Sequence, residues 1–151
     1  MIYLDNAATT RVCPEAAQAA LAAMTEDFGN PSSRYAHGAA AAERLRAHRA
    51  AVAEAVGCLP EELIFTSCGT EGDNWAVRAA VEYGRRKGRH IITTAIEHSA
   101  VLEPVRALAN QGYEVTYLRP DRWGRIDPQD LAAALRPDTV LVSMMLVNNE
   151  L

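Results

Sequence analysis

The chain has 151 residues, 49% of them hydrophobic and 23% charged, with a formal net charge of −4. This length suits about one domain with a sizeable core, and the mildly acidic balance without Lys or Arg runs argues against nucleic-acid binding. No window approaches about 18 uninterrupted apolar residues and the N-terminus does not resemble a signal peptide, so we expect no membrane association and a cytoplasmic protein.

Three cysteines, Cys13, Cys58 and Cys68, form no CxxC pair and no zinc spacing with the histidines. We therefore expect reduced thiols and no metal site. Cys68 precedes a predicted helix start, which lowers a thiol pKa. A small packing residue is the simpler interpretation, because no neighbouring His or Lys in the sequence would activate it.

The first third of the chain predicts two helices. Pro14 to Asp27 is rich in alanine, and a proline is acceptable in the first turn. Residues 28–33 break this helix, and a second helix is expected from Ala39 to Val56, ending at Gly57.

Beyond Pro60, strands and helices alternate strictly. The expected order is strand 63–67, helix 70–86, strand 90–95, helix 99–110, strand 113–118, helix 127–135 and strand 139–147. Such alternation predicts an α/β fold of three layers, a mainly parallel sheet with crossover helices. The last strand is apolar almost throughout, so it should be buried on both faces. Because only four residues follow it, we expect an incomplete domain.

Ligands gather at the carboxyl ends of strands in such sheets, and the turn after residues 63–67 carries small polar residues there. Gly69 and Thr70 would begin the next helix, where free N–H groups and the helix dipole favour a phosphate. The turn has neither the dinucleotide fingerprint nor the P-loop pattern, so a small phosphate ester fits better than NAD or ATP. Helix capping by Thr70 is the alternative.

Polar side chains follow two other predicted strands. His98 could stack on a flat ring or move protons near neutral pH, or could simply cap a helix or lie in solvent. Asn148 and Asn149 follow an apolar strand, where amides are costly to bury unless they bond something specific; a local Asx turn is the alternative. Asp121 to Asp127 forms a further polar cluster after strand 113–118.

Two short polar segments precede the predicted sheet. Residues 4–10 are poor in helix and core-strand formers, and residues 30–33 lie between the two first helices. By composition alone they are an N-terminal arm and a connecting loop.

Taken together, five motifs resemble the cysteine desulfurases, the branch of nitrogen fixation and iron–sulfur cluster assembly within the class V aminotransferase superfamily. The resemblance spans the whole chain. The motifs are YLDNAATT (3–10), GNPSS (29–33), FTSCGTE (65–71), EHSAV (97–101) and VNNE (147–150). Tyr35, where many members have His, and Leu151 weaken only the assignment of a subtype.

The resemblance implies a pyridoxal-phosphate (PLP) enzyme of fold type I, of which this chain would be the N-terminal part. Residues 1–30 would form an N-terminal arm and the first helix. Residues 31–151 would form an incomplete PLP-binding large domain, truncated after Leu151.

The resemblance also implies roles for matching residues. Gly69 and Thr70 would bind the cofactor phosphate, His98 would stack on the pyridine ring and assist proton transfer, and Asn149 would bond the phenolic oxygen. The residues implied on the substrate side are Asn6, Ala7, Thr9 and Asn30.

The implied reaction converts L-cysteine to L-alanine, with sulfur passed to an enzyme cysteine as a persulfide. The implied partners are a sulfur acceptor or iron–sulfur scaffold protein and a second copy in a homodimer. The family's Schiff-base lysine would lie downstream, and the only lysine here, Lys87, sits in a charged helix end, so the isolated chain should be inactive.

Two alternatives stay open. A selenocysteine lyase or cysteine sulfinate desulfinase would share these motifs, which concern the cofactor more than the leaving group. A non-catalytic fragment or split subunit would bind a complementary chain.

Overall fold

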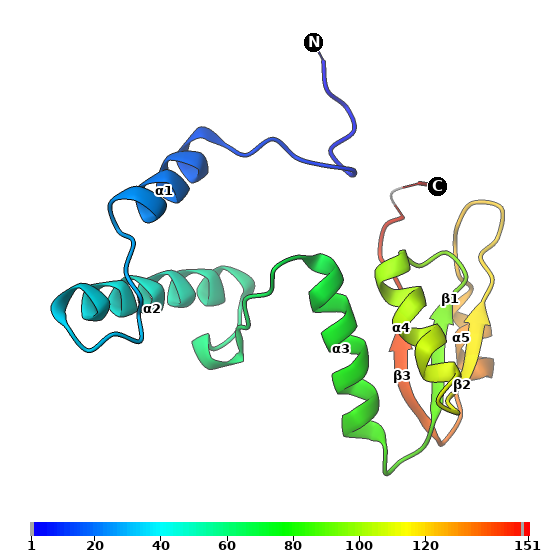
Figure 1. Ribbon diagram of the computed structural model, residues 1–151. Helices are drawn as coiled ribbons and strands as arrows, with labels where there is room; N and C mark the ends of the chain where they lie inside the picture. Colours follow the sequence, from blue (N-terminus) through cyan, green and yellow to red (C-terminus); the bar gives the residue numbers. More distant parts are fainter. Residues whose placement is uncertain (1, 149) are drawn as a thin grey trace. The chain divides into compact units, whose positions relative to one another are not determined.

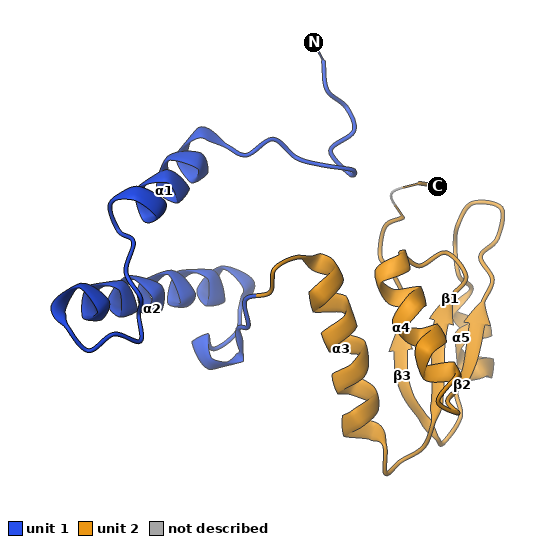
Figure 2. Cartoon of the chain, in the orientation of Figure 1, with its two compact units in different colours: residues 1–65 blue, residues 66–151 orange. Residues whose placement is uncertain are grey.

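The computed structural model describes residues 2–148 and 150–151, and the chain divides into two compact units (Figure 2). Unit 1 comprises residues 1–65 and unit 2 residues 66–151. The expected division into an N-terminal arm with the first helix, residues 1–30, and a large domain, residues 31–151, stays a prediction. In the part of the chain that is described, every helix is too short or too polar to span a bilayer.

Unit 1 contains two helices, as predicted, followed by one 3-10 turn (Figure 1). Helix α1 spans Pro14–Thr25 and begins with its proline, whose missing N–H would be unpaired in any helix. Helix α2 spans Ala36–Val56, and the 3-10 turn η1 spans Pro60–Glu62. Gly57 ends α2 with φ 76°, a left-handed conformation that glycine adopts without a Cβ clash.

The strand expected at residues 63–67 is wrong, because this segment forms no ladder with any described strand. The Arg49 guanidinium instead donates to the Leu63 carbonyl and lies 4.8 Å from the centre of the Phe65 ring. A strand needs a neighbour to pair its backbone groups, so an apolar, β-branched run is not sufficient by itself.

Unit 2 contains a parallel three-stranded sheet in the order β2-β1-β3, flanked by helices, which confirms the α/β fold class. Figure 1 shows α4 in front of the strands and α5 behind them. The strands are β1 (His90–Thr94), β2 (Glu114–Leu118) and β3 (Thr139–Ser143), and the helices are α3 (Gly69–Gly84), α4 (Ser99–Ala109) and α5 (Pro128–Ala134).

The core of unit 2 lies between β1 and helices α3 and α4. Every residue of the central strand β1 is buried. The buried apolar cluster comprises Val77 and Val81 from α3, Ile91 from β1, and Val101, Val105 and Leu108 from α4. His90 is also buried, with Nδ1 at 2.8 Å from the Thr139 hydroxyl and Nε2 at 2.9 Å from the Thr116 hydroxyl. These contacts compensate for the water that a buried polar ring loses.

Strand β3 is shorter and more exposed than expected. It ends at Ser143 instead of residue 147, and Val142 is 39% exposed, so the prediction of burial on both faces is wrong. Among the described residues β3 pairs only with β1, as an edge strand. Two residues after β3, the Met145 N–H donates to the Glu97 carboxylate instead of to a neighbouring strand.

Candidate active site

Helix α3 begins at Gly69 without a side-chain cap among the described residues. The N–H of Gly72 donates to the Cys68 carbonyl at 3.2 Å, so the N–H groups of Gly69, Thr70 and Glu71 precede the first helical bond. A Cβ added at Gly69 would meet no atom within 4 Å, which means that the space around the helix start is open. The residues present therefore fit a phosphate group.

Two side chains near this helix start have lowered pKa values. The Cys68 pKa is lowered, first by the N–H of Glu71 and then by the Ser67 hydroxyl. Glu71 Oε2 accepts hydrogen bonds from the Ser67 N–H at 2.6 Å and the Ser67 hydroxyl at 2.7 Å, which lower the Glu71 pKa. Both shifts have the same physical cause, hydrogen-bond donors that favour a negative charge. Donors in the turn from residue 67 to 71 therefore favour the charged forms of Cys68 and Glu71.

His98 precedes α4 and caps it. Its Nδ1 accepts a hydrogen bond from the Ala100 N–H at 3.1 Å, while the side chain stays exposed. The capping interpretation is thus confirmed, but capping occupies only one ring nitrogen. Because Nδ1 accepts, a neutral ring carries its proton on Nε2, which leaves this donor of the exposed ring for a ligand.

Asn74 links the two helix starts. Its Nδ2 donates to the Thr70 carbonyl at 2.9 Å and to the Ala100 carbonyl at 3.2 Å. The first turn of α3 and the first turn of α4 are thereby joined, so the predicted phosphate-binding turn lies beside the loop of His98. Sequence reasoning missed Asn74; the available signal was an amide inside a helix, where asparagine is a poor helix former.

Asn148 lies beside the same loop. Its Nδ2 donates to the Ile96 carbonyl at 2.8 Å, and its Oδ1 accepts from the N–H groups of Glu150 at 2.7 Å and Leu151 at 3.0 Å. The second set of bonds is the local turn named as the alternative for this residue. Asn149, the predicted ligand of the phenolic oxygen, lies outside the described residues.

A pocket of about 300 Å³ opens between the start of α4 and the segment after β3. It contains His98 and Asn148 but neither Gly69 nor Thr70. The lining residues are Ile96, Glu97, His98, Ser99, Leu102, Glu103, Arg106, Asn148 and Glu150.

The predicted substrate-side residues, Asn6, Ala7, Thr9 and Asn30, belong to unit 1 and are all exposed. Asn30 Oδ1 accepts a hydrogen bond from the Ser32 N–H at 2.9 Å, which makes an Asx turn in the loop before α2. The Asn30 amide nitrogen remains available as a donor. The substrate-binding role of these four residues stays a prediction.

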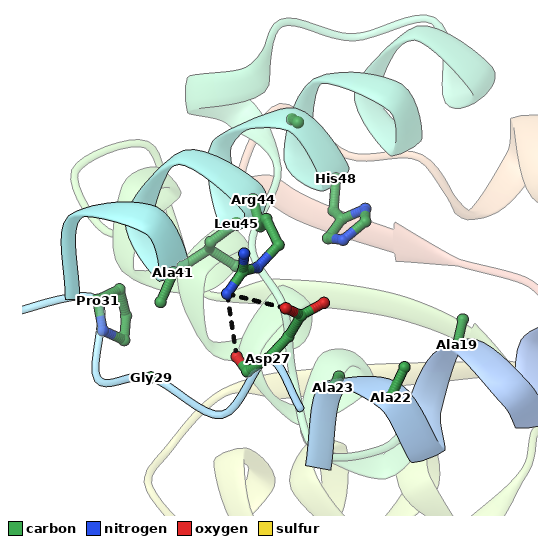
Figure 3. A pocket seen from close by; sticks show the side chains of 11 residues that line it. Ala19, Ala22, Ala23, Asp27, Gly29, Pro31, Ala41, Arg44, Leu45 and His48 are labelled. Carbon is green, nitrogen blue, oxygen red and sulfur yellow. Dashed lines mark hydrogen bonds and ion pairs between the residues drawn. The ribbon is translucent and has the colours of Figure 1, made fainter. Parts of the chain in front are cut away.

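Unit 1 also contains a pocket of about 460 Å³ beside α1 and α2 (Figure 3). Alanine side chains dominate its lining, and its charged pair, Arg44 and Asp27, is joined at 3.2 Å. It contains no predicted site residue. Within the described residues, no cluster of three or more His, Cys, Asp or Glu could hold a metal ion.

Known proteins resemble this chain over nearly its whole length. Cysteine desulfurase IscS of Methanosarcina thermophila is 47% identical over 99% of the chain, and IscS of Escherichia coli O139:H28 (strain E24377A / ETEC) is 49% identical over 99%. The chain spans only 37% and 38% of these two proteins.

Solved structures give the same result. A NifS-like protein matches with a TM-score of 0.92 and 39% identity, over 99% of this chain and 41% of its own. DndA from Streptomyces lividans matches with a TM-score of 0.82 and 49% identity, over 99% of this chain and 42% of its own. Cysteine desulfurases depend on PLP, the cofactor whose phosphate the start of α3 fits. Residues 2–151 match the family model described as aminotransferase class-V, and the chain belongs to this family.

Proposed function

We propose that the protein of which this chain forms part is a cysteine desulfurase, which converts L-cysteine to L-alanine and transfers sulfur to an enzyme cysteine. One observation carries the proposal: Asn74 joins the uncapped start of α3 to the loop of His98. A phosphate site beside an exposed imidazole is what a phosphorylated aromatic cofactor requires. The 47% and 49% identity to proteins named cysteine desulfurase supports the substrate class.

Different residues of unit 2 would bind different parts of PLP. Gly69 and Thr70 would bind the phosphate through backbone N–H groups and the Thr70 hydroxyl. The His98 ring would lie against the pyridine ring, and its Nε2 would exchange a proton with the reacting atoms. Asn149 would donate a hydrogen bond to the phenolic oxygen.

Unit 1 would supply the substrate contacts. The Asn30 amide nitrogen would donate to the cysteine carboxylate, and Asn6, Ala7 and Thr9 would also contact the substrate. A related solved structure, SspA in complex with cysteine, is 35% identical to this chain with a TM-score of 0.87. Cysteine binding by that relative supports L-cysteine as the ligand here.

When bound, PLP withdraws electrons from the substrate α-carbon, which makes its proton acidic and the C–S bond labile. Overall, L-cysteine and an enzyme thiol give L-alanine and an enzyme persulfide: the C–S bond breaks, an S–S bond forms, and a proton replaces sulfur on the β-carbon. A lysine from the rest of the polypeptide would bond the cofactor. Helix α3 has 16 residues and is therefore about 24 Å long at 1.5 Å per residue, and Lys87 follows its far end.

The proposal extends to partners and compartment. A sulfur acceptor or iron–sulfur scaffold protein would take the persulfide sulfur, and two copies would form a homodimer. Cys13, Cys58 and Cys68 are all free thiols, which fits a reducing compartment such as the cytoplasm.

Activity of the full-length protein tests the proposal. Purified protein should show the visible absorbance of bound PLP, and should form equal amounts of alanine and sulfide from L-cysteine with dithiothreitol. L-Selenocysteine and L-cysteine sulfinate serve as competing substrates. Cofactor binding without turnover of L-cysteine, or no cofactor at all, would contradict the assignment.

A further inference from the structure

Glu97 is a buried acidic residue that lines the pocket of His98 and Asn148. It lies between β1 and α4, directly before His98, and is only 8% exposed. Acidic side chains are rarely buried unless specific donors compensate for the lost water. The partners of Glu97 therefore indicate what its burial achieves.

The two hydrogen bonds that Glu97 makes with described residues both use Oε1. The Thr94 hydroxyl donates at 3.0 Å from the end of β1, and the Met145 N–H donates at 2.6 Å from the segment after β3. The second bond joins residues 48 positions apart in the sequence. The distance is at the short end of the range for a hydrogen bond from an N–H to an oxygen.

A second link runs parallel to the first. Asn148 Nδ2 donates to the Ile96 carbonyl at 2.8 Å, one residue before Glu97. Residues 94–98 and residues 145–148 are thus joined at two points. The first segment ends at His98, and the second leads into Asn149.

We propose that Glu97 is a positioning residue, which holds the chain leading into Asn149 against the loop of His98. Its carboxyl group accepts the Met145 N–H, which a strand residue would otherwise offer to a neighbouring strand, so β3 does not continue through Met145. The inference rests on the proposed function, since the effect of this link on PLP depends on contact between His98 and the cofactor.

The test uses the full-length protein with Glu97→Ala, Glu97→Gln and the control Glu82→Gln. Glu82 lies in the last turn of α3, is exposed and pairs with Arg85. Hydrogen exchange of the Met145 amide reports the link itself. The dissociation constant and the visible absorbance maximum of bound PLP report its effect on the site.

Glu97→Ala should speed exchange at Met145 more than in β1, weaken PLP binding by at least about tenfold and shift the absorbance maximum. Glu97→Gln keeps an acceptor oxygen and should restore most of each property, while Glu82→Gln should match the wild type. Unchanged exchange at Met145 overturns the link. Faster exchange with unchanged PLP affinity and absorbance overturns the positioning role.

The proposal can still be tested if Glu97→Ala does not fold or if the wild-type protein binds no PLP. If Glu97→Ala does not fold, Thr94→Val removes one donor and should show the same changes to a smaller degree; no change in that variant contradicts the proposal. If the wild-type protein binds no PLP, the proposed function fails and with it the role toward the cofactor, while exchange at Met145 still decides the link.

Discussion

The starts of α3 and α4 lie side by side, yet they treat their N–H groups in opposite ways. At α4 the His98 ring accepts the Ala100 N–H, and at α5 the Asp127 carboxylate likewise accepts the Gln129 N–H at 2.8 Å. At α3 no side-chain cap hydrogen bond is formed in the described structure, although the Glu71 N–H lies near enough to the Cys68 thiol to lower its pKa. A capped start stabilises its helix, whereas an uncapped start keeps its donors for an anion.

The comparison also decides between the two interpretations of Thr70. A capping side chain belongs to the residue before the first helical position, and that residue here is Cys68. Thr70 lies inside the first turn, so the interpretation that it merely caps α3 is wrong. Its hydroxyl can act together with the backbone donors.

A charged capping residue at the start of α3 should have the largest effect on PLP affinity. Cys68→Asp would place a carboxylate among the free N–H groups, beside the phosphate. Two unit charges 4 Å apart interact by about 4 kcal/mol at an effective dielectric constant of 20. We expect PLP affinity to fall on the order of 100-fold or more in an equilibrium titration of the full-length protein, with Cys68→Ala near the wild type. Equal affinity of both variants would refute the phosphate site.

Removal of the Thr70 hydroxyl should have the next largest effect. A hydrogen bond to a charged group contributes about 1.5–3 kcal/mol, so Thr70→Ala should weaken PLP binding roughly tenfold to a hundredfold. Thr70→Ser keeps the hydroxyl and is the matched control. The same titration measures both variants, and unchanged occupancy in Thr70→Ala would remove this residue from the site.

His98 substitutions separate capping from ring contact. His98→Ala should lower the free energy of unfolding by about 0.5–2 kcal/mol through loss of the α4 cap, whereas His98→Asn retains a capping oxygen. Both variants should change the absorbance of bound PLP, because both lose the ring. Denaturant unfolding and spectroscopy provide the two measurements. Equal stability of Ala and Asn variants would show that the cap contributes nothing.

Substitution of Glu71 should have the smallest effect, a change in stability that depends on pH. Its folded-state pKa is lowered below the ordinary value of 4.5, so the unfolded chain takes up the proton first as pH falls. The stabilising contribution is therefore complete above about pH 4.5 and is lost as pH falls through the folded-state pKa. Glu71→Gln should be slightly less stable than the wild type near pH 7, with the difference closing in acid. Thermal unfolding across pH 3–7 checks this, and a constant difference would contradict it.

Local signals predicted most of unit 2. Both ends of α3, β1, α4, β2 and α5 lie within two residues of their predicted bounds, because apolar spacing and capping residues are local. Two predictions were wrong: the strand at residues 63–67 and the extension of the last strand to residue 147. Both depend on a partner for backbone hydrogen bonds, which the pattern of a single segment does not reveal.

In the candidate site, too, residues with local signals were predicted and residues with long-range contacts were missed. Gly69, Thr70 and His98 were predicted because each stands at a helix start, a feature visible in adjacent residues. Asn74 and Glu97 were missed, since their decisive contacts reach 26 and 48 residues along the chain. The residues that bind are therefore easier to predict than the residues that hold them in place.

The buried His90 offers a probe of the sheet that needs neither cofactor nor catalysis. Its two ring nitrogens contact threonine hydroxyls from β3 and β2, so the imidazole spans all three strands. A neutral imidazole keeps one ring proton, and burial slows the exchange of that proton with water. In proton NMR this nucleus should give a protected downfield resonance that appears only when the three strands are assembled.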